Sequence, residues 1–459
     1  MTPNPLAADA DTIVAVATAA GRGGVGVVRI SGTSLEFLLP VLFNCPIAPR
    51  RAVYCQFLGD DGSALDTGIA LYFRAPASFT GEDVIELQGH GGPVVMDMLV
   101  RRVLGLGARL ARPGEFSERA FLNGKLDLVQ AEAVADLIAA DSEAAARGAM
   151  RSLQGEFSRR IQVLVDDLVK LRVQIEAALD FPDEEVGDRL DTELLIARLD
   201  ALLAGFSALR ASVQQGVVLR DGIRVAIAGP PNAGKSRLLN ALSGQETAIV
   251  AEIAGTTRDV LRETIQLEGI PIHIVDTAGL RDSDDQIEVE GVRRARAEIE
   301  RADCVLLVAD SALESREDTV QITADFTRCV ADGRLTLVLN KADLSGLAVG
   351  PRQGSVPTLV VSAATGAGLD TLRAHLVSRA RGTGGVASEF LGRRRHLSAL
   401  DMAVWHVEQA RLLTRSDTLA LEFLAEELRQ AQQQMGSISG AFTSEDLLGQ
   451  IFSSFCIGK

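Results

Sequence analysis

The sequence predicts a multidomain chain that combines α/β regions with an all-α region. Three observations support this prediction. With 459 residues, the chain is too long for one hydrophobic core. Short β-rich runs alternate with glycine turns up to about residue 124. Apolar residues then recur at steps of three and four over residues 153–179 and again over 195–213, which is typical of long amphipathic helices.

The order of these regions predicts four segments. In the first we expect strands within 11–18, 24–32, 69–73 and 83–87, and a helix over 93–106. Helical periodicity begins near residue 126, breaks at Pro182, and resumes after the glycine-rich residues 382–385. The predicted segments are an N-terminal α/β domain (1–124), a first helical part (125–218), a second α/β domain (219–380) and a second helical part (381–459). The second α/β domain is therefore expected to be inserted into a helical domain, although periodicity alone does not establish that the two helical parts pack together.

Composition narrows the possible classes of protein. The 46 basic and 61 acidic residues give a net charge of −15, which argues against tight unaided binding to nucleic acid. The five cysteines form no C-x-x-C pair, so neither a disulfide framework nor structural zinc is expected and a reducing compartment is favoured. Because no apolar run reaches transmembrane length and no signal peptide is visible, we expect a cytoplasmic protein without a membrane span.

Residues 229–236 read G-P-P-N-A-G-K-S and fit the phosphate-binding pattern G-x-x-x-x-G-K-[ST]. An apolar strand is expected before this loop, at 224–228, and a helix after it, from 237. Backbone N–H groups of such a loop cradle phosphates, Lys235 can reach the β- and γ-phosphates, and the Ser236 hydroxyl can ligate Mg²⁺. A chance glycine turn is the alternative, and the flanking strand and helix argue against it.

Four further motifs follow in order and identify the nucleotide. They are G-T-T-R-D at 255–259, D-x-x-G at 276–279, N-K-x-D at 340–343, and Ser362-Ala363 after an apolar strand. In N-K-x-D, the carboxylate accepts both the ring N1–H and the exocyclic amine of guanine, and adenine offers neither donor there. Together the motifs predict an inserted Ras-like P-loop GTPase domain.

The expected nucleotide contacts include two Mg²⁺ ligands, Ser236 and Thr257. The full expected set is Asn232, Ala233, Gly234, Lys235, Ser236, Arg237, Ala251, Glu252, Ile253, Ala254, Gly255, Thr256, Thr257, Asp276, Thr277, Ala278, Gly279, Asn340, Lys341, Ala342, Asp343, Ser362, Ala363 and Ala364. Ras-type enzymes place a water-orienting glutamine directly after D-x-x-G, and Leu280 stands there instead. Hydrolysis therefore needs another residue, for which the acidic run 282–290 offers candidates, although most of that run reads as a solvated loop.

Four motifs outside the GTPase region point to one family. They are G-R-G-G-V-G at 21–26, F-T-G-E-D-V at 79–84 with G-H-G-G at 89–92, R-P-G-E-F-S-E-R-A-F at 112–121, and the terminal F-C-I-G-K at 455–459. With these motifs the chain resembles, over essentially its whole length, the MnmE (TrmE) family of tRNA modification GTPases.

The resemblance implies that the N-terminal domain dimerises and binds a tetrahydrofolate derivative, in the 5,10-methylene or 5-formyl form. The matching positions are Arg29, Glu86, Lys125 and Lys459. On residue type alone, Arg29 and Lys125 would more often be ordinary surface charges. The family also implies a catalytic role for Cys456, for which a small buried apolar residue at a helix end is the alternative.

The resemblance further implies potassium-dependent hydrolysis, activated by dimerisation of the GTPase domains. Asn232 matches the potassium-binding asparagine, and Ala251, Ile253 and Thr256 complete the expected K⁺ shell. Ala251 stands where a threonine is often seen, which is harmless if only its carbonyl binds. Glu288 is the expected water-orienting residue, and Lys235 and Thr257 are the other expected catalytic residues.

The expected function is therefore that of a homodimeric GTP hydrolase working with the flavoprotein MnmG (GidA), which holds FAD. The pair would add an aminomethyl or carboxymethylaminomethyl group to C5 of the wobble uridine, position 34, of certain tRNAs, with the tRNA bound mainly together with the partner. Two alternatives remain open. One is a ribosome-assembly or RNA-binding GTPase of the same switch family, and the other is a binding switch whose folate site is vestigial.

Overall fold

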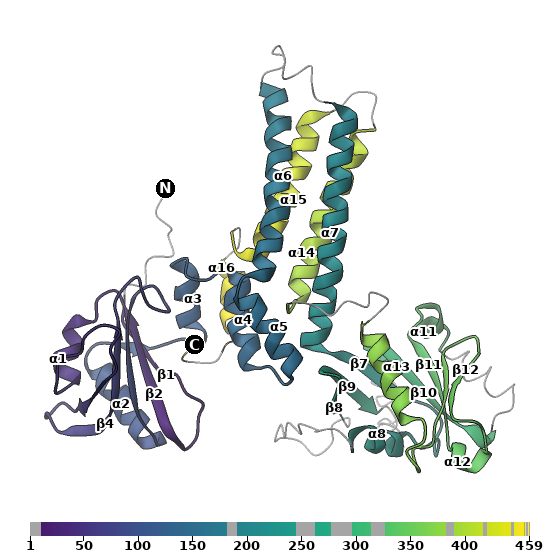
Figure 1. Cartoon of the computed structure of the whole chain (residues 1–459), viewed down its shortest axis with the longest axis horizontal. Coiled ribbons are helices and arrows are strands. Elements are labelled where there is room, and N and C mark those ends of the chain that lie inside the picture. Colours follow the sequence, from purple (N-terminus) through teal and green to yellow (C-terminus); the bar gives the residue numbers. More distant parts are fainter. Residues whose placement is uncertain are drawn as a thin grey trace, which may run out of the picture. The chain divides into compact units, whose positions relative to one another are not determined.

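The computed structural model describes residues 11–180, 191–244, 262–276, 296–313, 326–381, 390–415, 420–441, 445–453, 455 and 458. The chain divides into two compact units (Figure 1). The first comprises Met1–Ala139, Met150–Phe206 and Ala399–Lys459, and the second comprises Ala140–Ala149 and Ser207–Ser398. The domain boundaries expected from the sequence stay predictions.

The N-terminal part of the first unit is a six-stranded sheet in the order β3-β4-β5-β2-β1-β6. Its elements are β1 (Ile13–Val16), β2 (Gly23–Gly32), η1 (Glu36–Leu38), α1 (Leu39–Leu42), β3 (Val53–Leu58), β4 (Ala64–Phe73), β5 (Asp83–Gly91), α2 (Pro93–Gly105) and β6 (Arg109–Leu110). One face of this sheet packs its apolar side chains against α1 and α2. The expected strands and the expected helix at 93–106 are confirmed, whereas β3, β6 and α1 were not expected.

The remaining elements of the first unit are helical and come from both ends of the chain. They are α3 (Glu115–Leu122), α4 (Leu128–Ile138), α6 (Glu156–Asp180), α15 (Leu421–Ser439), α16 (Glu445–Ser453), and the parts of α5 (Glu143–Leu153), α7 (Thr192–Asp221) and α14 (Arg394–Leu413) that belong to this unit. Helix α6 packs along α15, and Arg411 of α14 pairs with Asp200 of α7. This confirms a helical domain built from two segments.

Two details of the helical periodicity were wrong. The apolar stripe expected as one helix over 153–179 is divided, because Gly155 adopts a positive φ of 81° between α5 and α6. The helical periodicity after residue 385 includes Leu419, Phe423 and Leu428, but Phe423 is 67% exposed. Leu424 and Leu428 are buried instead, one helical turn apart on the face that meets the bundle.

The second unit is a seven-stranded sheet in the order β12-β13-β11-β10-β7-β9-β8. Its elements are β7 (Ile223–Ala228), α8 (Lys235–Ser243), β8 (Arg262–Leu267), β9 (Ile270–Asp276), β10 (Cys304–Asp310), η4 (Ser311–Leu313), α11 (Thr327–Ala331), β11 (Leu335–Asn340), α12 (Ala342–Ser345), β12 (Gly350–Arg352), β13 (Thr358–Val360) and α13 (Leu369–Arg381). The five central strands are parallel, and β8 and β12 are antiparallel edges.

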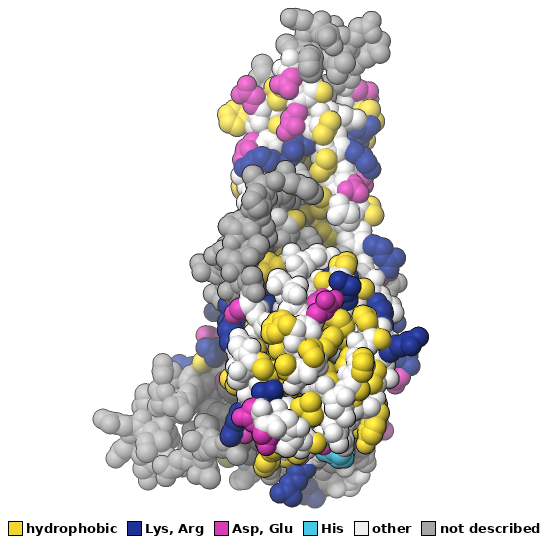
Figure 2. All heavy atoms as spheres, turned by 90° about the vertical axis from the view of Figure 1, so that its left-hand side faces the viewer, with side chains coloured by type: hydrophobic (Ala, Val, Ile, Leu, Met, Phe, Trp, Pro, Cys, Tyr) yellow, Lys and Arg dark blue, Asp and Glu magenta, His cyan; other side chains and the backbone are white. Residues whose placement is uncertain are grey.

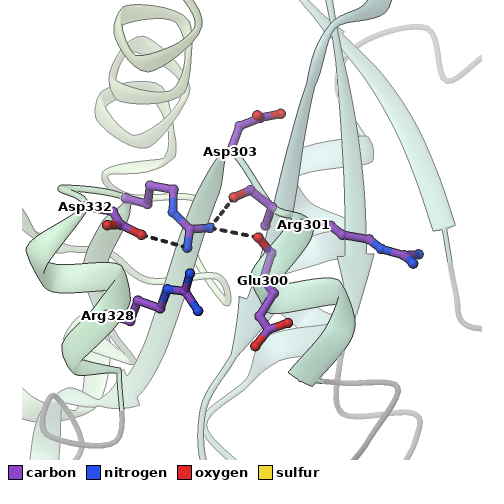
Figure 3. Close-up of a pocket in the computed structure, with 7 residues that line it drawn as sticks. Glu300, Arg301, Asp303, Arg328 and Asp332 are labelled. Carbon is purple, nitrogen blue, oxygen red and sulfur yellow. Dashed lines mark hydrogen bonds and ion pairs between the residues drawn. The ribbon is translucent and has the colours of Figure 1, made fainter.

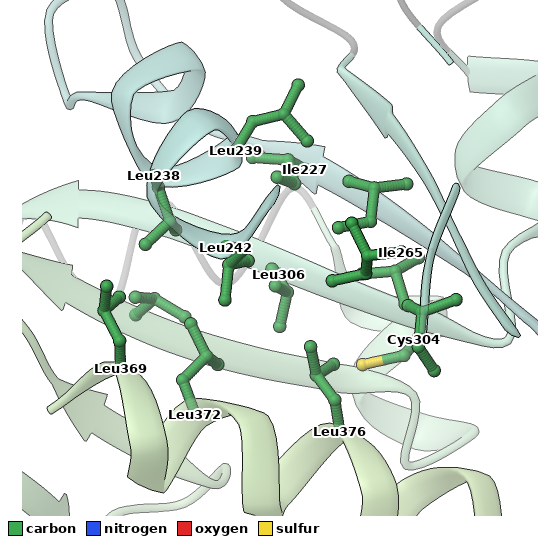
Figure 4. Packing of buried hydrophobic residues seen from close by; sticks show 14 of the residues in the cluster. Ile227, Leu238, Leu239, Leu242, Ile265, Cys304, Leu306, Leu369, Leu372 and Leu376 are labelled. Carbon is green, nitrogen blue, oxygen red and sulfur yellow. The ribbon is translucent and has the colours of Figure 1, made fainter. Parts of the chain in front are cut away.

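Both faces of this parallel sheet are covered. On one face, leucines of α8 and α13 pack against Ile227 of β7 and Leu306 of β10 (Figure 4). On the other face, alternate residues such as Leu307 and Leu337 pack with Cys329 of α11. A parallel sheet covered on both faces binds ligands beyond the carboxyl ends of its strands, so this edge positions the expected nucleotide site. No helix in the described ranges is long and apolar enough to cross a membrane.

Candidate functional site

The predicted phosphate loop connects β7 to α8. At two of its positions, only glycine fits the backbone conformation and the space available. Gly229 has a φ of 139°, and a Cβ there would lie 2.1 Å from the Val308 carbonyl oxygen. Gly234 has a φ of 90°, and a Cβ there would lie 2.4 Å from the Asn340 amide nitrogen. The loop is thus pressed against β10 and β11, and its glycines are required by close approach as well as by backbone conformation.

Lys235 begins α8 and its side chain folds back over the loop. The residue is buried, and its Nζ donates to the carbonyl oxygens of Gly229 at 3.0 Å and Pro230 at 2.8 Å. The ammonium group is therefore held against the phosphate loop itself, beside the helix N-terminus where an anion is favoured. Asn232 lies on the exposed tip of the loop with a φ of 61°.

The structure brings together the first expected Mg²⁺ ligand and the aspartate of D-x-x-G. Asp276 is the last residue of β9 and is buried. The Ser236 hydroxyl donates to Asp276 Oδ2 at 3.1 Å. A hydroxyl and a carboxylate are hard oxygen donors of the kind that Mg²⁺ prefers, so these two residues fit the expected ion.

The N-K-x-D tetrad lies at the end of the neighbouring strand β11. The Asn340 side chain donates to the Ala233 carbonyl at 2.9 Å and accepts from the Ala363 N–H at 2.9 Å. Asn340 thereby ties the phosphate loop to the segment expected to contact the guanine O6. The Ser362 hydroxyl donates to the Asp343 carboxylate, and this hydrogen bond holds Asp343 beside the segment that contains Ser362 and Ala363.

Lys341 fixes the other side of the tetrad. Its backbone is left-handed, with a φ of 66°, and its Nζ pairs with Asp310 at the end of β10 at 2.7 Å. Three strand ends, those of β7, β10 and β11, are therefore cross-connected by side chains. Arg237 in α8 and Ala364 after Ala363 both lie exposed at this edge.

Several expected site residues lie outside the described residues. They are Ala251, Glu252, Ile253, Ala254, Gly255, Thr256, Thr257, Thr277, Ala278, Gly279 and Glu288 in the second unit, and Cys456 and Lys459 at the end of the chain. Their assigned roles stay predictions, as do the roles of the residues whose positions are described above.

A second cluster lies on the N-terminal sheet. Arg29 of β2 and Glu86 of β5 are directly opposite in the antiparallel register, and their side chains pair at 2.9 Å. The Arg29 guanidinium also lies over two aromatic rings, 5.7 Å from the centre of Phe79 and 5.8 Å from that of Phe116. The arginine is therefore held by charge on one side and by cation–π contacts on the others.

The end of the chain reaches this cluster. Leu448, Ile451, Phe452 and Phe455 form an apolar cluster with Leu128 and Ala131 of α4, so the last helix and Phe455 after it are docked on α4. Beyond it, the Gly458 carbonyl accepts from Arg29 Nη1 at 3.4 Å. Sequence positions 429 residues apart thus meet at one guanidinium.

Glycines allow the terminal segment to approach closely. Gly458 has a φ of 93°, and a Cβ there would lie 2.2 Å from the Val16 carbonyl oxygen. Gly114 of the R-P-G-E-F motif has a φ of 69°, and a Cβ there would lie 2.5 Å from the Phe452 carbonyl oxygen. Both glycines belong to motifs that carried the family resemblance, and close packing of the chain end explains them physically.

Lys125 is less directly placed. Its Nζ donates to the Pro76 carbonyl at 3.1 Å, and its stem lies beside the position of Gly81. It therefore contacts the loop that carries Phe79, and no direct contact with Arg29 or Glu86 is seen among the described residues.

Sequence reasoning missed an ion network beside this cluster. Arg119 of α3 pairs with Glu82 at 3.0 Å and with Glu115 at 3.0 Å, and Arg109 pairs with Glu115 at 2.6 Å. Glu82 also accepts from Ser31, next to Ile30 on β2. The signal was visible as Glu115 and Arg119 at helical spacing in the 112–121 motif, but the sequence does not give their partners.

The network sets the ionisation of Glu115, whose side chain is 1% exposed. Burial alone would raise its pKa, but hydrogen bonds from Arg109, the Arg112 backbone and Arg119 outweigh it and lower the pKa of Glu115 to about 2. Glu115 therefore stays ionised inside the domain and fixes α3 against the sheet.

A polar pocket of about 400 Å³ lies at the start of β10 and β11, the edge of the sheet away from the phosphate loop (Figure 3). It is lined by Glu300, Arg301, Ala302, Asp303, Arg328, Asp332 and Arg334. Arg334 donates to the carbonyl oxygens of Ile299 and Ala302 and pairs with Asp332. Three basic and three acidic side chains balance one another, so the arrangement ties a helix end to the sheet and selects no charged ligand.

Two family models match the chain. One, described as MnmE helical domain, matches residues 128–456, and the other, described as GTP-binding protein TrmE N-terminus, matches residues 12–125. The G domain of the FeoB iron transporter of T. maritima is 26% identical over 34% of this chain and 98% of its own, with a TM-score of 0.27.

Two full-length relatives are each named tRNA modification GTPase MnmE. The protein of Ectopseudomonas mendocina is 56% identical over 454 residues, covering 98% of this chain and 99% of its own. That of Vibrio parahaemolyticus is 53% identical, with the same coverage. These matches show that the chain is a GTP hydrolase and belongs to the MnmE family of tRNA modification GTPases.

Proposed function

We propose that this GTP hydrolase acts with the flavoprotein MnmG to add an aminomethyl or carboxymethylaminomethyl group to C5 of uridine 34 of certain tRNAs. One observation supports the proposal in addition to the family membership. The chain contains the expected guanine-nucleotide residues at one sheet edge and, separately, an Arg29–Glu86 cluster that its own C-terminal segment contacts. A GTPase that only switches a partner has no need for the second site.

At the nucleotide edge, each side chain is proposed to do one task. Asp343 accepts from the guanine N1–H and amine, and Lys235 moves from the loop carbonyls onto the phosphates when they bind. Ser236 and Thr257 would hold Mg²⁺, with Asp276 acting through water. Mg²⁺ there supplies charge neutralisation on the β- and γ-phosphates.

Hydrolysis is proposed to use Glu288 to orient the attacking water, because Leu280 cannot. Asn232, with the backbones of Ala251, Ile253 and Thr256, would hold K⁺. The exposed position of Asn232 on the loop tip supports this role, since its amide is available to an ion and to a second GTPase domain. K⁺ at this place supplies the positive charge that an arginine finger provides elsewhere.

The N-terminal cluster is proposed to bind a tetrahydrofolate derivative. Glu86 offers a carboxylate for the amide edge of a pterin, and Arg29, with Lys125 and Lys459, offers cations for a glutamate tail. The stacking of Phe79 against Arg29 supports an open, aromatic-walled site, because Phe79 is 37% exposed.

The same face of the N-terminal sheet is proposed to form the homodimer. Tyr54 and Ile69 are paired across β3 and β4 and are 76% and 38% exposed. By strand register they share the face that carries Arg29 and Glu86. Figure 2 shows apolar side chains gathered over the N-terminal region. Large apolar groups on an uncovered sheet face are typical of a protein interface.

The function is tested by analysing tRNA nucleosides from a deletion strain that carries either the wild-type or a variant gene. We expect the wild-type gene to restore the modified wobble uridine, and Asp343→Asn and Arg29→Ala to fail for different reasons. If the deletion strain still contains the modified wobble uridine but accumulates ribosome precursors, the ribosome-assembly alternative replaces this proposal. If Arg29→Ala restores modification fully, the N-terminal cluster has no part in the chemistry.

A further inference from the structure

Two cysteines face each other at the edge of the N-terminal sheet. Phe43 and Phe57 form an isolated antiparallel bridge, and their rings meet edge to face at 5.9 Å between centres. Counted from this bridge, Cys45 comes two residues after Phe43 and Cys55 two residues before Phe57, and residues 44 and 45 form a bend. A disulfide joins cysteines whose Cα atoms are about 4.4–6.8 Å apart.

Asn44 and Gln56, the neighbours of the two cysteines, hold the two segments together through their side chains. The Gln56 N–H donates to Asn44 Oδ1 at 3.0 Å, and Asn44 Nδ2 donates to Gln56 Oε1 at 3.3 Å. Cys45 and Cys55 both belong to the apolar cluster under α1 and α2, so their side chains point to the same face. The two thiols are close enough to interact, because the Cys45 thiol is one of the groups that raise the pKa of Cys55.

The two thiols differ in exposure. Cys45 is half-buried, whereas Cys55 is 5% exposed. Burial, together with the neighbouring Cys45 thiol, raises the pKa of Cys55 to about 12. Cys45 is therefore the thiol that a reagent in solution can reach. Cys55 stays protonated until it reacts with the oxidised sulfur of Cys45.

No other ligand competes for this pair. Within the described ranges, no three His, Cys, Asp or Glu side chains lie close enough to hold a metal ion. The other two cysteines with described thiols, Cys304 and Cys329, lie in different core clusters of the second unit. Two neighbouring thiols can be oxidised to a disulfide.

We propose that Cys45 and Cys55 form a reversible disulfide, a thiol modification site that responds to hydroperoxides. The Cys45 thiolate attacks the peroxide, the O–O bond breaks, and a sulfenic acid and one water form. The Cys55 sulfur then attacks the sulfenic sulfur, the S–O bond breaks, and the Cys55 proton leaves with the hydroxide as a second water. Two thiols and one peroxide thus give one disulfide and two waters. In a reducing cytosol the pair rests as a dithiol.

The sequence makes the bond easy to detect. Arg50 and Arg51 lie between the cysteines, so trypsin separates Cys45, in peptide 30–50, from Cys55, in peptide 52–74. The full-length protein is treated with hydrogen peroxide, blocked with iodoacetamide, digested and analysed by mass spectrometry. We expect the two peptides to be joined, to separate on reduction with dithiothreitol, and to remain apart in Cys45→Ser. The peptides of Cys304 and Cys329 serve as internal controls and should stay reduced.

A second measurement does not depend on the digest. Because the bond closes a short loop at the sheet edge, oxidation should raise the unfolding midpoint of the wild-type protein by about 4 °C or more and leave that of Cys45→Ser unchanged. In Cys55→Ser, Cys45 should accumulate as a sulfenic acid that dimedone traps. The proposal is overturned if the folded wild-type protein yields Cys45 sulfinic acid or two unmodified peptides with no cross-linked product.

Discussion

The two sheets of this protein build their sites in opposite ways. In the parallel sheet, the described motif residues lie at or just after strand ends, with one motif each at the ends of β7, β9 and β11. In the antiparallel sheet, Arg29 and Glu86 lie within strands, and Gly458 arrives from the end of the chain. The residues of the nucleotide edge come from short local motifs. The Arg29–Glu86 cluster, in contrast, forms only when segments far apart in the sequence pack together.

This difference predicts how each site fails. A substitution at the nucleotide edge removes one contact from a frame that Asn340 and Lys341 hold from several strands. A substitution at the N-terminal cluster can act through the ion network of Glu115 and Arg119 or through the docked terminal segment. We therefore expect effects on nucleotide binding to be specific, and effects on the N-terminal site to be accompanied by effects on stability.

The largest expected effect is that of Asp343→Asn on GTP affinity. The change replaces an acceptor of two guanine protons with a side chain that can also donate, so affinity should fall about 100-fold, equal to roughly 3 kcal/mol. Binding is measured by the fluorescence of a labelled guanine nucleotide.

Xanthosine triphosphate provides the matched control for Asp343→Asn. Xanthine carries a carbonyl where guanine carries its amine, so the variant amide can donate to it and affinity for xanthosine triphosphate should rise. Equal losses for both nucleotides would mean that Asp343 supports the Ser362 segment instead of reading the base.

Glu115→Gln tests whether the ion network of the N-terminal domain contributes to the free energy of unfolding. The pKa of folded Glu115, about 2, lies below its ordinary value of 4.5. The carboxylate therefore contributes stability that is fully present above about pH 4.5 and is lost as the pH falls through 2. At pH 7 the variant should lose about 2–3 kcal/mol, and its stability should vary less between pH 4.5 and 2.

Urea unfolding of the full-length protein at several pH values measures this effect. Glu36→Gln is the control, since Glu36 forms an exposed ion pair with Arg74 that contributes little. An identical pH slope in wild-type protein and Glu115→Gln would contradict the assigned role of Glu115.

The contrast between the sheets also explains what the sequence could predict. The strand before the phosphate loop and the helix after it followed from local patterns, because glycine conformation and strand ends are properties of neighbouring residues. The contacts of Asn340 with Ala233 and of Lys341 with Asp310 did not follow, because they join residues far apart in the sequence. The contact of Gly458 with Arg29 depends on the apolar docking of α16. Periodicity can suggest that this helix has an apolar face, but it does not tell which part of the protein that face contacts. The contact of Arg119 with Glu82 and the approach of Cys45 to Cys55 depend on how separate segments pack, which no local pattern specifies.

Arg29→Ala should separate the two sites functionally. Removing the guanidinium deletes a charge-assisted contact and leaves Glu86 without its ion-pair partner, so affinity for 5-formyl-tetrahydrofolate should fall about 20-fold, equal to roughly 2 kcal/mol. GTP turnover of the same sample should be unchanged, because the nucleotide edge is in the other unit. Calorimetry and phosphate release are measured in parallel, with Arg101→Ala on α2 as the control. Unchanged folate affinity would remove Arg29 from the site.

The smallest expected effect concerns potassium and is read from turnover alone. Steady-state hydrolysis in K⁺ should exceed that in Na⁺ by about tenfold, which corresponds to roughly 1.4 kcal/mol of charge stabilisation in the transition state. Asn232 has a φ of 61°, so a change there can disturb the loop backbone as well as remove the amide. Asn232→Gly distinguishes these effects, because glycine accepts this φ without strain and carries no side chain. We expect Asn232→Gly to keep GTP affinity and to hydrolyse GTP equally slowly in both salts. If Asn232→Gly retains the full preference for K⁺, the amide is not a ligand and the potassium site must be built from backbone carbonyls alone.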